Sequence, residues 1–176
     1  MDRCTLRRAG DPDVADVAEL VQAAYEHYVE RIGMQPGPMT MDHAAVIRDR
    51  DVTVAEVDGT IAGVIVLGLD EDGFTVENVA VHPSRQARGL GRVLLAHAES
   101  EAVRSGFDTV HLFTHELMVE NIALYSRVGY VEHDRRSHGD FSLVHMRKPV
   151  PGPAPSPAGL VTVLAATAPA SRCAGC

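Results

Sequence analysis

The segment that most constrains the fold is the apolar run at residues 61–69. Its sequence, IAGVIVLGL, has no charged or hydrogen-bonding side chain. A strand of this kind is typical of the centre of a sheet that is covered on both faces. Asp58-Gly59, just before it, is a two-residue turn signal, which predicts a hairpin with a preceding strand at Val52–Val57. The chain therefore needs helices on both sides of a sheet.

Hydrophobic periodicity predicts the remaining elements. A strand at Cys4–Ala9 precedes a helix that starts at Asp11-Pro12 and stops at Gly33. The further expected elements are a helix at 41–50, a strand at 74–81, a helix at 89–104, a strand at 109–115, a helix at 120–129, and strands at 130–136 and 141–147. This order predicts a mixed α/β sheet, not a regular βαβ repeat.

The composition changes after Lys148. Residues 149–176 hold six of the ten prolines and one charged residue. Prolines at alternate positions favour an extended, unpacked chain. We expect a domain at 1–148 and a Pro/Ala-rich, disordered tail at 149–176. Cys173 and Cys176 have no second cysteine pair, and the nine histidines show no metal-ligand spacing, so no metal site is expected.

Charge and hydropathy narrow the function classes. The net charge of −8 argues against a general nucleic-acid binder, although Arg85, Arg88 and Arg92 could form a local pocket for an anion. No apolar run approaches the roughly 20 residues that span a bilayer, and no signal peptide is evident at the N-terminus. We expect a soluble cytoplasmic protein that binds neither membrane nor nucleic acid.

A glycine-containing turn, Gln86–Gly91, precedes the third expected helix. Amides at such a helix start form an anion site, and glycine lets a phosphate approach them. The GxxxxGK[ST] pattern of a P-loop is absent, and a leucine at 94 stands where a dinucleotide fingerprint needs its third glycine. A degenerate NAD(P) site, with Glu116 downstream, and a simple tight turn both remain alternatives.

Two patterns make the sequence resemble the GCN5-related N-acetyltransferase (GNAT) family. Gln86-Ala87-Arg88-Gly89-Leu90-Gly91 matches the Q/R-x-x-G-x-G/A hallmark, and Asn121 with Tyr125 matches the family's downstream Asn and Tyr. The resemblance covers residues 4–148. It implies a mixed, mostly antiparallel sheet of about seven strands with flanking helices, splayed between the fourth and fifth strands.

The resemblance also implies a cofactor site for acetyl-CoA without a metal. The turn residues would hold the pyrophosphate, the strand end would pair with the pantetheine arm, and Asn121 would contact that arm. The expected cofactor residues are Val79, Ala80, Val81, Gln86, Ala87, Arg88, Gly89, Leu90, Gly91, Arg92 and Asn121.

Transfer of an acetyl group to an amine needs a base for the ammonium and an acid for the departing sulfur. No cysteine lies in a plausible site, so we expect direct attack in a ternary complex. Tyr125 is the candidate acid, with ordinary packing in an apolar stripe as the alternative. Glu77 is the candidate base, with a solvated residue or a water chain as alternatives. Strand alternation would place Thr75, Glu77 and Val79 on one face.

The acceptor is expected to be a primary amine of a small molecule or peptide. Tyr28 and Met39 are the candidate substrate-binding residues, in an apolar wall with Tyr25 and Met34. A non-catalytic acyl-CoA-binding module of the same fold stays open as an alternative function. The resemblance is compatible with a homodimer.

Overall fold

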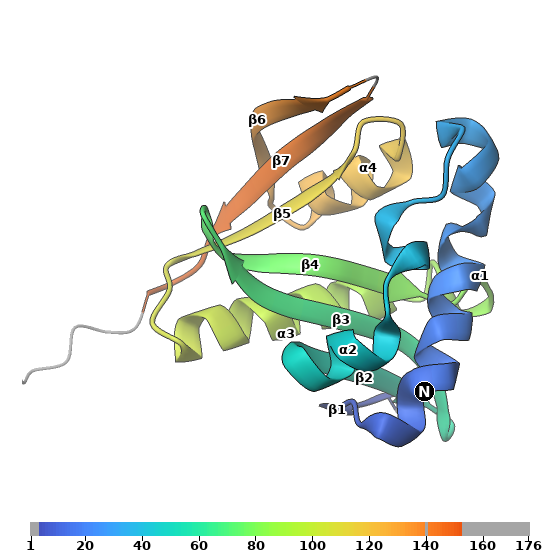
Figure 1. Ribbon diagram of the computed structural model, residues 1–176. Helices are drawn as coiled ribbons and strands as arrows, with labels where there is room; N and C mark the ends of the chain where they lie inside the picture. Colours follow the sequence, from blue (N-terminus) through green and yellow to red (C-terminus); the bar gives the residue numbers. More distant parts are fainter. Residues whose placement is uncertain (1–3, 140, 153–176) are drawn as a thin grey trace, which may run out of the picture.

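The computed structural model describes residues 4–139 and 141–152. Seven strands form one sheet in the order β1-β2-β3-β4-β5-β7-β6, and helices cover both faces (Figure 1). The strands are β1 Cys4–Arg8, β2 Asp51–Val57, β3 Thr60–Asp70, β4 Gly73–Val81, β5 Thr109–His115, β6 Val131–His138 and β7 Phe141–Pro149. The α-helices are α1 Val14–Ile32, α2 His43–Asp49, α3 Leu90–Arg104 and α4 Val119–Arg127. The predicted mixed, mostly antiparallel sheet is confirmed.

Local signals in the sequence set where elements begin and end. Asp58 and Gly59 both have positive φ, 53° and 78°, as the predicted two-residue turn requires. Gly33 ends α1 in the left-handed conformation at φ 77°, and the Asp42 side chain caps α2 by accepting from the amides of Ala44 and Ala45. Short 3-10 turns at Asp11–Asp13, Gly37–Thr40 and Pro83–Arg85 were not expected from the sequence.

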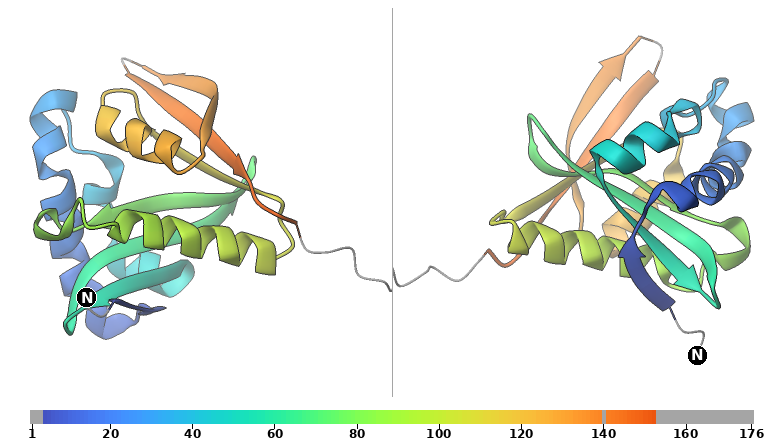
Figure 2. Two further views of the ribbon diagram at one scale, coloured as in Figure 1. Left: turned by 180° about the vertical axis from the view of Figure 1, so that it is seen from behind. Right: turned by 60° about the horizontal axis from the view of Figure 1, so that its bottom comes forward.

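Two apolar clusters cover the two faces of the sheet. On one face α1 buries residues at helical spacing against β2 and β3; these are Val17, Leu20, Val21, Ala24 and Tyr28. On the other face α3 buries Leu94, Leu95, Ala98 and Ala102 among residues of β3, β5 and β7. The views in Figure 2 show α3 and α1 on opposite sides of the sheet. β3 is therefore covered on both faces, as its apolar sequence predicts.

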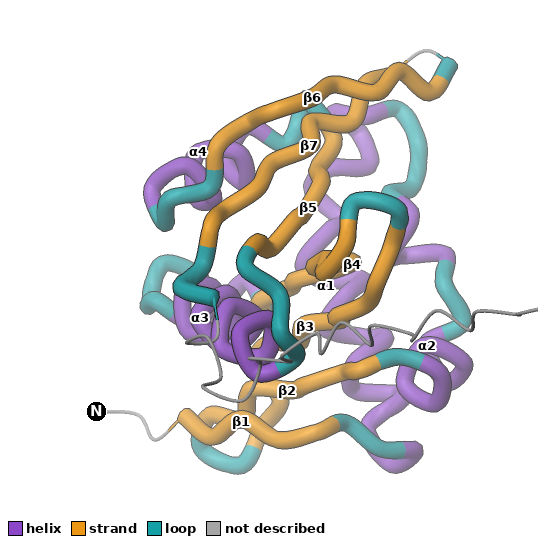
Figure 3. The backbone as a smooth tube through the Cα atoms, turned by 90° about the vertical axis from the view of Figure 1, so that its left-hand side faces the viewer, coloured by secondary structure: helices purple, strands orange, loops and turns teal. Residues whose placement is uncertain are grey.

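The sheet opens between β4 and β5, the one parallel pair among the described strands. The two strands pair only at Thr75 with His111 and at Val76 with Leu112, near the start of β4. From Glu77 to Val81 the two strands do not pair, and β5, β7 and β6 turn away from β1–β3 (Figure 3). The expected splay between the fourth and fifth strands is confirmed, and it leaves backbone of β4 available to a ligand.

A β-bulge lies in β4 at Glu77. Val66 pairs with Asn78 and Leu67 pairs with Val76, so Glu77 is an extra residue between them. Strict alternation, as expected from the sequence, is wrong beyond this point. Val76 packs in the cluster on the α3 face, whereas Ala80 packs in the cluster on the α1 face. The bulge thus reverses which face each later residue of β4 presents.

The packed chain continues past Lys148. β7 runs to Pro149, and the buried Val150 donates its amide to the carbonyl of Asp108 over 2.8 Å. Most of the predicted tail, 153–176 with both its cysteines, lies outside the described residues. No helix among the described residues is long and apolar enough to cross a membrane.

Candidate active site

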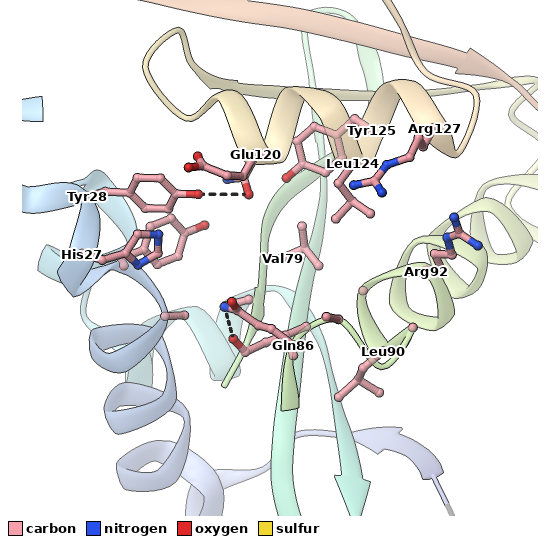
Figure 4. Close-up of a pocket in the computed structure, with 18 residues that line it drawn as sticks. His27, Tyr28, Val79, Gln86, Leu90, Arg92, Glu120, Leu124, Tyr125 and Arg127 are labelled. Carbon is pink, nitrogen blue, oxygen red and sulfur yellow. Dashed lines mark hydrogen bonds between the residues drawn. The ribbon is translucent and has the colours of Figure 1, made fainter. Parts of the chain in front are cut away.

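A cavity of about 610 Å³, here called the turn cavity, lies beside the glycine-containing turn. It is bounded by the end of β4, the start of α3, the middle of α1 and one face of α4 (Figure 4). Ten of the eleven predicted cofactor residues line it; these are Val79, Ala80, Val81, Gln86, Ala87, Gly89, Leu90, Gly91, Arg92 and Asn121. Segments far apart in the sequence therefore meet in one site.

The backbone of the turn has an unusual conformation. Ala87 and Gly89 both have positive φ, 60° and 87°. The left-handed backbone conformation raises the conformational free energy of an alanine, so surrounding contacts must hold Ala87 in it. One such contact comes from the Gln86 side chain, whose Nε2 donates to the Val81 carbonyl over 3.0 Å. That hydrogen bond ties the turn to the end of β4.

The first turn of α3 supplies hydrogen-bond donors to this cavity. The amides of Leu90, Gly91 and Arg92 have no carbonyl four residues earlier within the helix, because the helix starts at Leu90. The positive end of the helix dipole lies at the same place. A Cβ added at Gly89 would meet nothing within 4 Å, so the space beside the turn is open. The arrangement suits an anion such as a phosphate.

Two of the three described Asp, Glu, Lys or Arg side chains that line the turn cavity are arginines. Arg92 and Arg127 line it together with His27, while its one acid among the described lining residues, Glu120, forms an ion pair with Arg31 at 2.8 Å. Arg127 was not predicted. Helical spacing places Arg127 one turn after Ala123 on α4. Whether its side chain reaches the turn cavity depends on how α4 packs, which the sequence does not show.

Tyr125 lies between the turn cavity and a second cavity. It is only 6% exposed, and among the described residues its hydroxyl has no hydrogen-bond partner. Figure 4 shows its ring projecting from α4 beside Leu124. Burial raises the pKa of Tyr125 above its ordinary value, with the nearby Tyr28 adding to the effect. The side chain thus stays a neutral phenol, a potential proton donor, at neutral pH.

The second cavity, here called the gap cavity, has a volume of about 480 Å³ and lies where β4 and β5 diverge. Its walls come from the segment after α1, from β4, β5 and β7, and from α4. It shares four lining residues with the turn cavity: Tyr25, Val79, Asn121 and Tyr125. The two cavities therefore meet at the predicted proton donor.

Glu77 lines the gap cavity but not the turn cavity. Its Oε2 lies 3.3 Å from Nε of Arg50, which is half exposed at the end of α2. Its side chain lies against Gly68 of β3, where any Cβ would overlap the carboxylate. The glycine thus provides the room that the Glu77 side chain occupies. The β-bulge and this glycine together fix where the carboxylate lies.

Asn78 lines the gap cavity without a role predicted from the sequence, and its partner is Tyr25, which was expected only as part of an apolar wall. The Tyr25 hydroxyl donates to Asn78 Oδ1 over 2.8 Å in a buried hydrogen bond between α1 and β4. The consecutive polar residues Glu77 and Asn78 in an apolar strand were the available signal, because only a bulge lets both face one side. Nothing in the sequence pairs Asn78 with Tyr25.

The two predicted substrate-binding residues, Tyr28 and Met39, have different surroundings. Tyr28 lines the turn cavity instead of the gap cavity, and its hydroxyl donates to Asn121 Oδ1 over 3.5 Å. Burial raises the pKa of Tyr28 to about 12. Met39 lines neither cavity; it packs against the α1 cluster. Its neighbours Met34 and Met41 line the gap cavity, because the Gly37–Thr40 turn points Met39 the other way.

Arg88, a predicted cofactor residue, and two histidines of β5 lie outside the turn cavity. Arg88 is exposed and does not line the turn cavity. His115 lines the gap cavity, with its Nδ1 accepting from the Leu117 amide over 3.1 Å and its ring stacked on Phe141. His111 lies 5.8 Å from His133, ring centre to ring centre, outside both cavities. Among the described residues, no group of His, Cys, Asp or Glu is arranged to hold a metal ion.

Comparison with known proteins gives one family. Residues 48–132, which include both cavities' β4 and α4 walls, match the family model of the acetyltransferase (GNAT) domain. An acetyltransferase of Pectobacterium atrosepticum is 30% identical over 77 residues, 44% of this chain. The match spans only 55% of that relative's length.

Solved structures share the fold over most of the chain. The PaiA N-acetyltransferase of Thermoplasma acidophilum, solved with coenzyme A, has a TM-score of 0.70 at 16% identity and covers 84% of this chain and 99% of that one. The yncA protein of Salmonella typhimurium, solved with its cofactor acetyl-CoA, has a TM-score of 0.65 at 24% identity and covers 89% and 99%. At these identities the likeness establishes the fold.

Proposed function

We propose that this chain, which matches the acetyltransferase (GNAT) domain model over residues 48–132, transfers an acetyl group from acetyl-CoA to a primary amine. The observation that carries the proposal is the meeting of two cavities at Tyr125, one beside a backbone anion site and one beside a carboxylate. A two-substrate reaction needs such a junction, because the donor and the acceptor must reach the same atoms from different sides.

The turn cavity fits the cofactor. The amides at the start of α3 and the guanidinium groups of Arg92 and Arg127 suit its pyrophosphate. The unpaired edge of β4 at Val79–Val81 suits the amides of the pantetheine arm, which would add to the sheet like a further strand. Asn121, shared by both cavities, is positioned to contact the arm where it reaches the junction.

The bound cofactor supplies the activated acetyl thioester. Glu77 accepts a proton from the ammonium of the acceptor, directly or through water, and so makes the amine nucleophilic. The amine then attacks the carbonyl carbon directly, since no cysteine lines either cavity among the described residues. The Tyr125 hydroxyl donates its proton to the departing sulfur as the carbon–sulfur bond breaks and the amide bond forms. The second proton that the nitrogen loses returns to the Tyr125 oxygen, directly or through water.

Two other functions make different predictions. A non-catalytic acyl-CoA-binding module would bind acetyl-CoA without transferring the acetyl group. An NAD(P)-binding protein would be stabilised by a dinucleotide. The unpartnered hydroxyl of Tyr125 at the junction favours the enzyme, because a binding module has no need for a proton donor there.

A ligand-shift experiment followed by a turnover assay tests the proposal. Acetyl-CoA and CoA should raise the melting temperature, whereas NADH and NADPH should not. Release of the CoA thiol should then depend on an added primary amine. Stabilisation by acetyl-CoA without thiol release over a broad amine panel would favour the binding module. No shift with either CoA species would remove the proposal altogether.

A further inference from the structure

We infer that the gap cavity takes a monoamine with one cationic head and an apolar body. The inference rests on the proposed function for the identity of the reaction. It adds the class of acceptor, which the lining of the cavity determines independently of the cofactor. Three features of that lining carry it: its charge, its apolar wall and the position of its one carboxylate.

The first feature is the charge of the gap cavity, which comes from a single carboxylate. Among the described lining residues Glu77 is the only acid, and no lysine or arginine is present. Among the other polar lining groups, Asn78 accepts from Tyr25 and His115 Nδ1 accepts from the Leu117 amide, whereas His115 Nε2 has no partner in the described chain. Glu77 also lies 3.3 Å from Nε of Arg50, which is outside the lining, so one ammonium would share the carboxylate with that guanidinium. A second would lose its hydration without gaining a counter-charge, which is costly.

The rest of the lining is largely apolar and open to solvent. Three of its large side chains are among the most exposed hydrophobic residues of the described chain: Met34 at 50%, Met41 at 46% and Phe113 at 38%. They come from two separate segments and converge on the same cavity. Phe141 and Leu143 of β7 extend this surface. Exposed apolar groups that converge in this way mark a ligand-binding surface.

The position of Glu77 orients the ligand. Glu77 is two residues before Val79, which both cavities share. Its carboxylate lies against Gly68 of β3 and 3.3 Å from Nε of Arg50. An ammonium beside Glu77 would leave the rest of the molecule against Met34, Met41 and Phe113. A carboxylate or a second ammonium at the far end of the ligand would lie in the apolar wall. Polyamines and ω-amino acids are therefore poor acceptors.

The test compares three amines that share one six-carbon chain. n-Hexylamine ends in a methyl group, 1,6-diaminohexane in a second ammonium, and 6-aminohexanoate in a carboxylate. Affinity for the protein saturated with CoA is measured by calorimetry, and kcat/KM by release of the CoA thiol from acetyl-CoA. We expect n-hexylamine to exceed both others by at least about tenfold in both measurements.

A variant of the apolar wall provides the matched control. Phe113→Glu places a second carboxylate on a side chain that is already partly exposed, so the fold should tolerate it. It should raise the preference for 1,6-diaminohexane over n-hexylamine by at least about tenfold, whereas Phe113→Leu should leave the preference unchanged. A shift in the ratio cannot result from simple loss of folded protein.

The outcomes separate this inference from the proposed function. Thiol release with a preference for the diamine, for the ω-amino acid or for a peptide amine would overturn the inference and leave the acetyltransferase proposal standing. Tighter binding of n-hexylamine without thiol release would support the inference and count against acetyl transfer. Equal affinity for the three amines would show that the apolar wall does not select.

Discussion

The Tyr25 hydroxyl and the Asn78 side chain form a hydrogen bond of 2.8 Å that joins α1 to β4 at the junction of the two cavities. Asn78 is 8% exposed, and Tyr25 lines both cavities. When a buried amide oxygen loses its hydrogen-bond donor, the full desolvation free energy of that oxygen remains uncompensated. This pair therefore contributes to stability and also shapes the common wall of the site.

Tyr25→Phe should lower the free energy of unfolding by about 1–3 kcal/mol, because it leaves Asn78 Oδ1 without a donor in the interior. Urea denaturation followed by circular dichroism measures the change. Tyr28→Phe is the control, since its hydroxyl makes only a long contact of 3.5 Å with Asn121, and its loss should be smaller. Equal effects of the two substitutions would mean that the Tyr25–Asn78 bond adds no stability.

Tyr125→Phe should lower kcat by at least about tenfold while the dissociation constant of acetyl-CoA changes little, because only the proton donor is removed. Since burial raises the pKa of Tyr125, the wild-type rate should show no alkaline loss from this residue near its ordinary pKa of about 10. Steady-state kinetics across pH and calorimetry with acetyl-CoA provide the measurements.

Tyr130→Phe is a matched control for that substitution. Tyr130 packs edge-on against Tyr125 with 6.2 Å between ring centres, and its buried hydroxyl has no hydrogen-bond partner in the described chain. Removing this hydroxyl should leave kcat unchanged and should not destabilise the fold. If the two variants lost the same activity, the role of proton donor for Tyr125 would be wrong.

Gly89→Ala should weaken acetyl-CoA binding by at least about tenfold, because φ is 87° and the new Cβ would enter the open space beside the turn. The left-handed conformation should also cost about 1 kcal/mol of stability. Calorimetry and urea denaturation measure the two effects. At Gly91 a Cβ would make only an ordinary 3.5 Å contact with Leu124, so Gly91→Ala should bind nearly normally. A larger loss at Gly91 would contradict this account of the turn.

Asp13→Asn should destabilise the protein at neutral pH by about 1–2 kcal/mol, a value reduced for the partial exposure of Arg7. Hydrogen bonds from Arg7 lower the pKa of Asp13 to about 2. The folded pKa lies below the unfolded value of about 3.9, so this stabilisation is present above pH 4 and is lost as the pH falls toward 2.

Urea denaturation of wild type and Asp13→Asn from pH 7 to pH 3 tests that assignment, and the difference should shrink toward the acid end. Asp49→Asn, which removes an exposed partner of Arg48, is the control and should show no measurable difference at any pH. A difference that stays constant down to pH 3 would exclude the Arg7 pair as its source.

Most of the fold could be predicted because its signals are local. The Asp58-Gly59 turn, the apolar run of β3 and the stop at Gly33 act within a few residues, and the elements they mark begin and end within about two residues of their predicted bounds. The glycine-containing turn was also recognisable, since its conformation depends on its own residues.

The acceptor side of the site could not be predicted in the same way. The bulge at Glu77 changes the face of every later residue of β4, and alternation alone gives the wrong side for Asn78. Met39 was expected beside Met34 in the acceptor wall and Met41 was not considered, whereas the short Gly37–Thr40 turn decides which methionine faces the cavity. Phe113 and Leu143 become neighbours only through the pairing of β5 with β7.

The bulge also separates two parts of this site in evolution. Val76 and Asn78 already pair with the adjacent residues Leu67 and Val66, so deletion of Glu77 would leave Asn78–Val81 on their present faces. One lost codon would therefore remove the acid and leave the cofactor-facing edge of the strand as it is. The chemistry of the acceptor pocket at position 77 can change, by substitution or by deletion, while the strand end that faces the cofactor is kept.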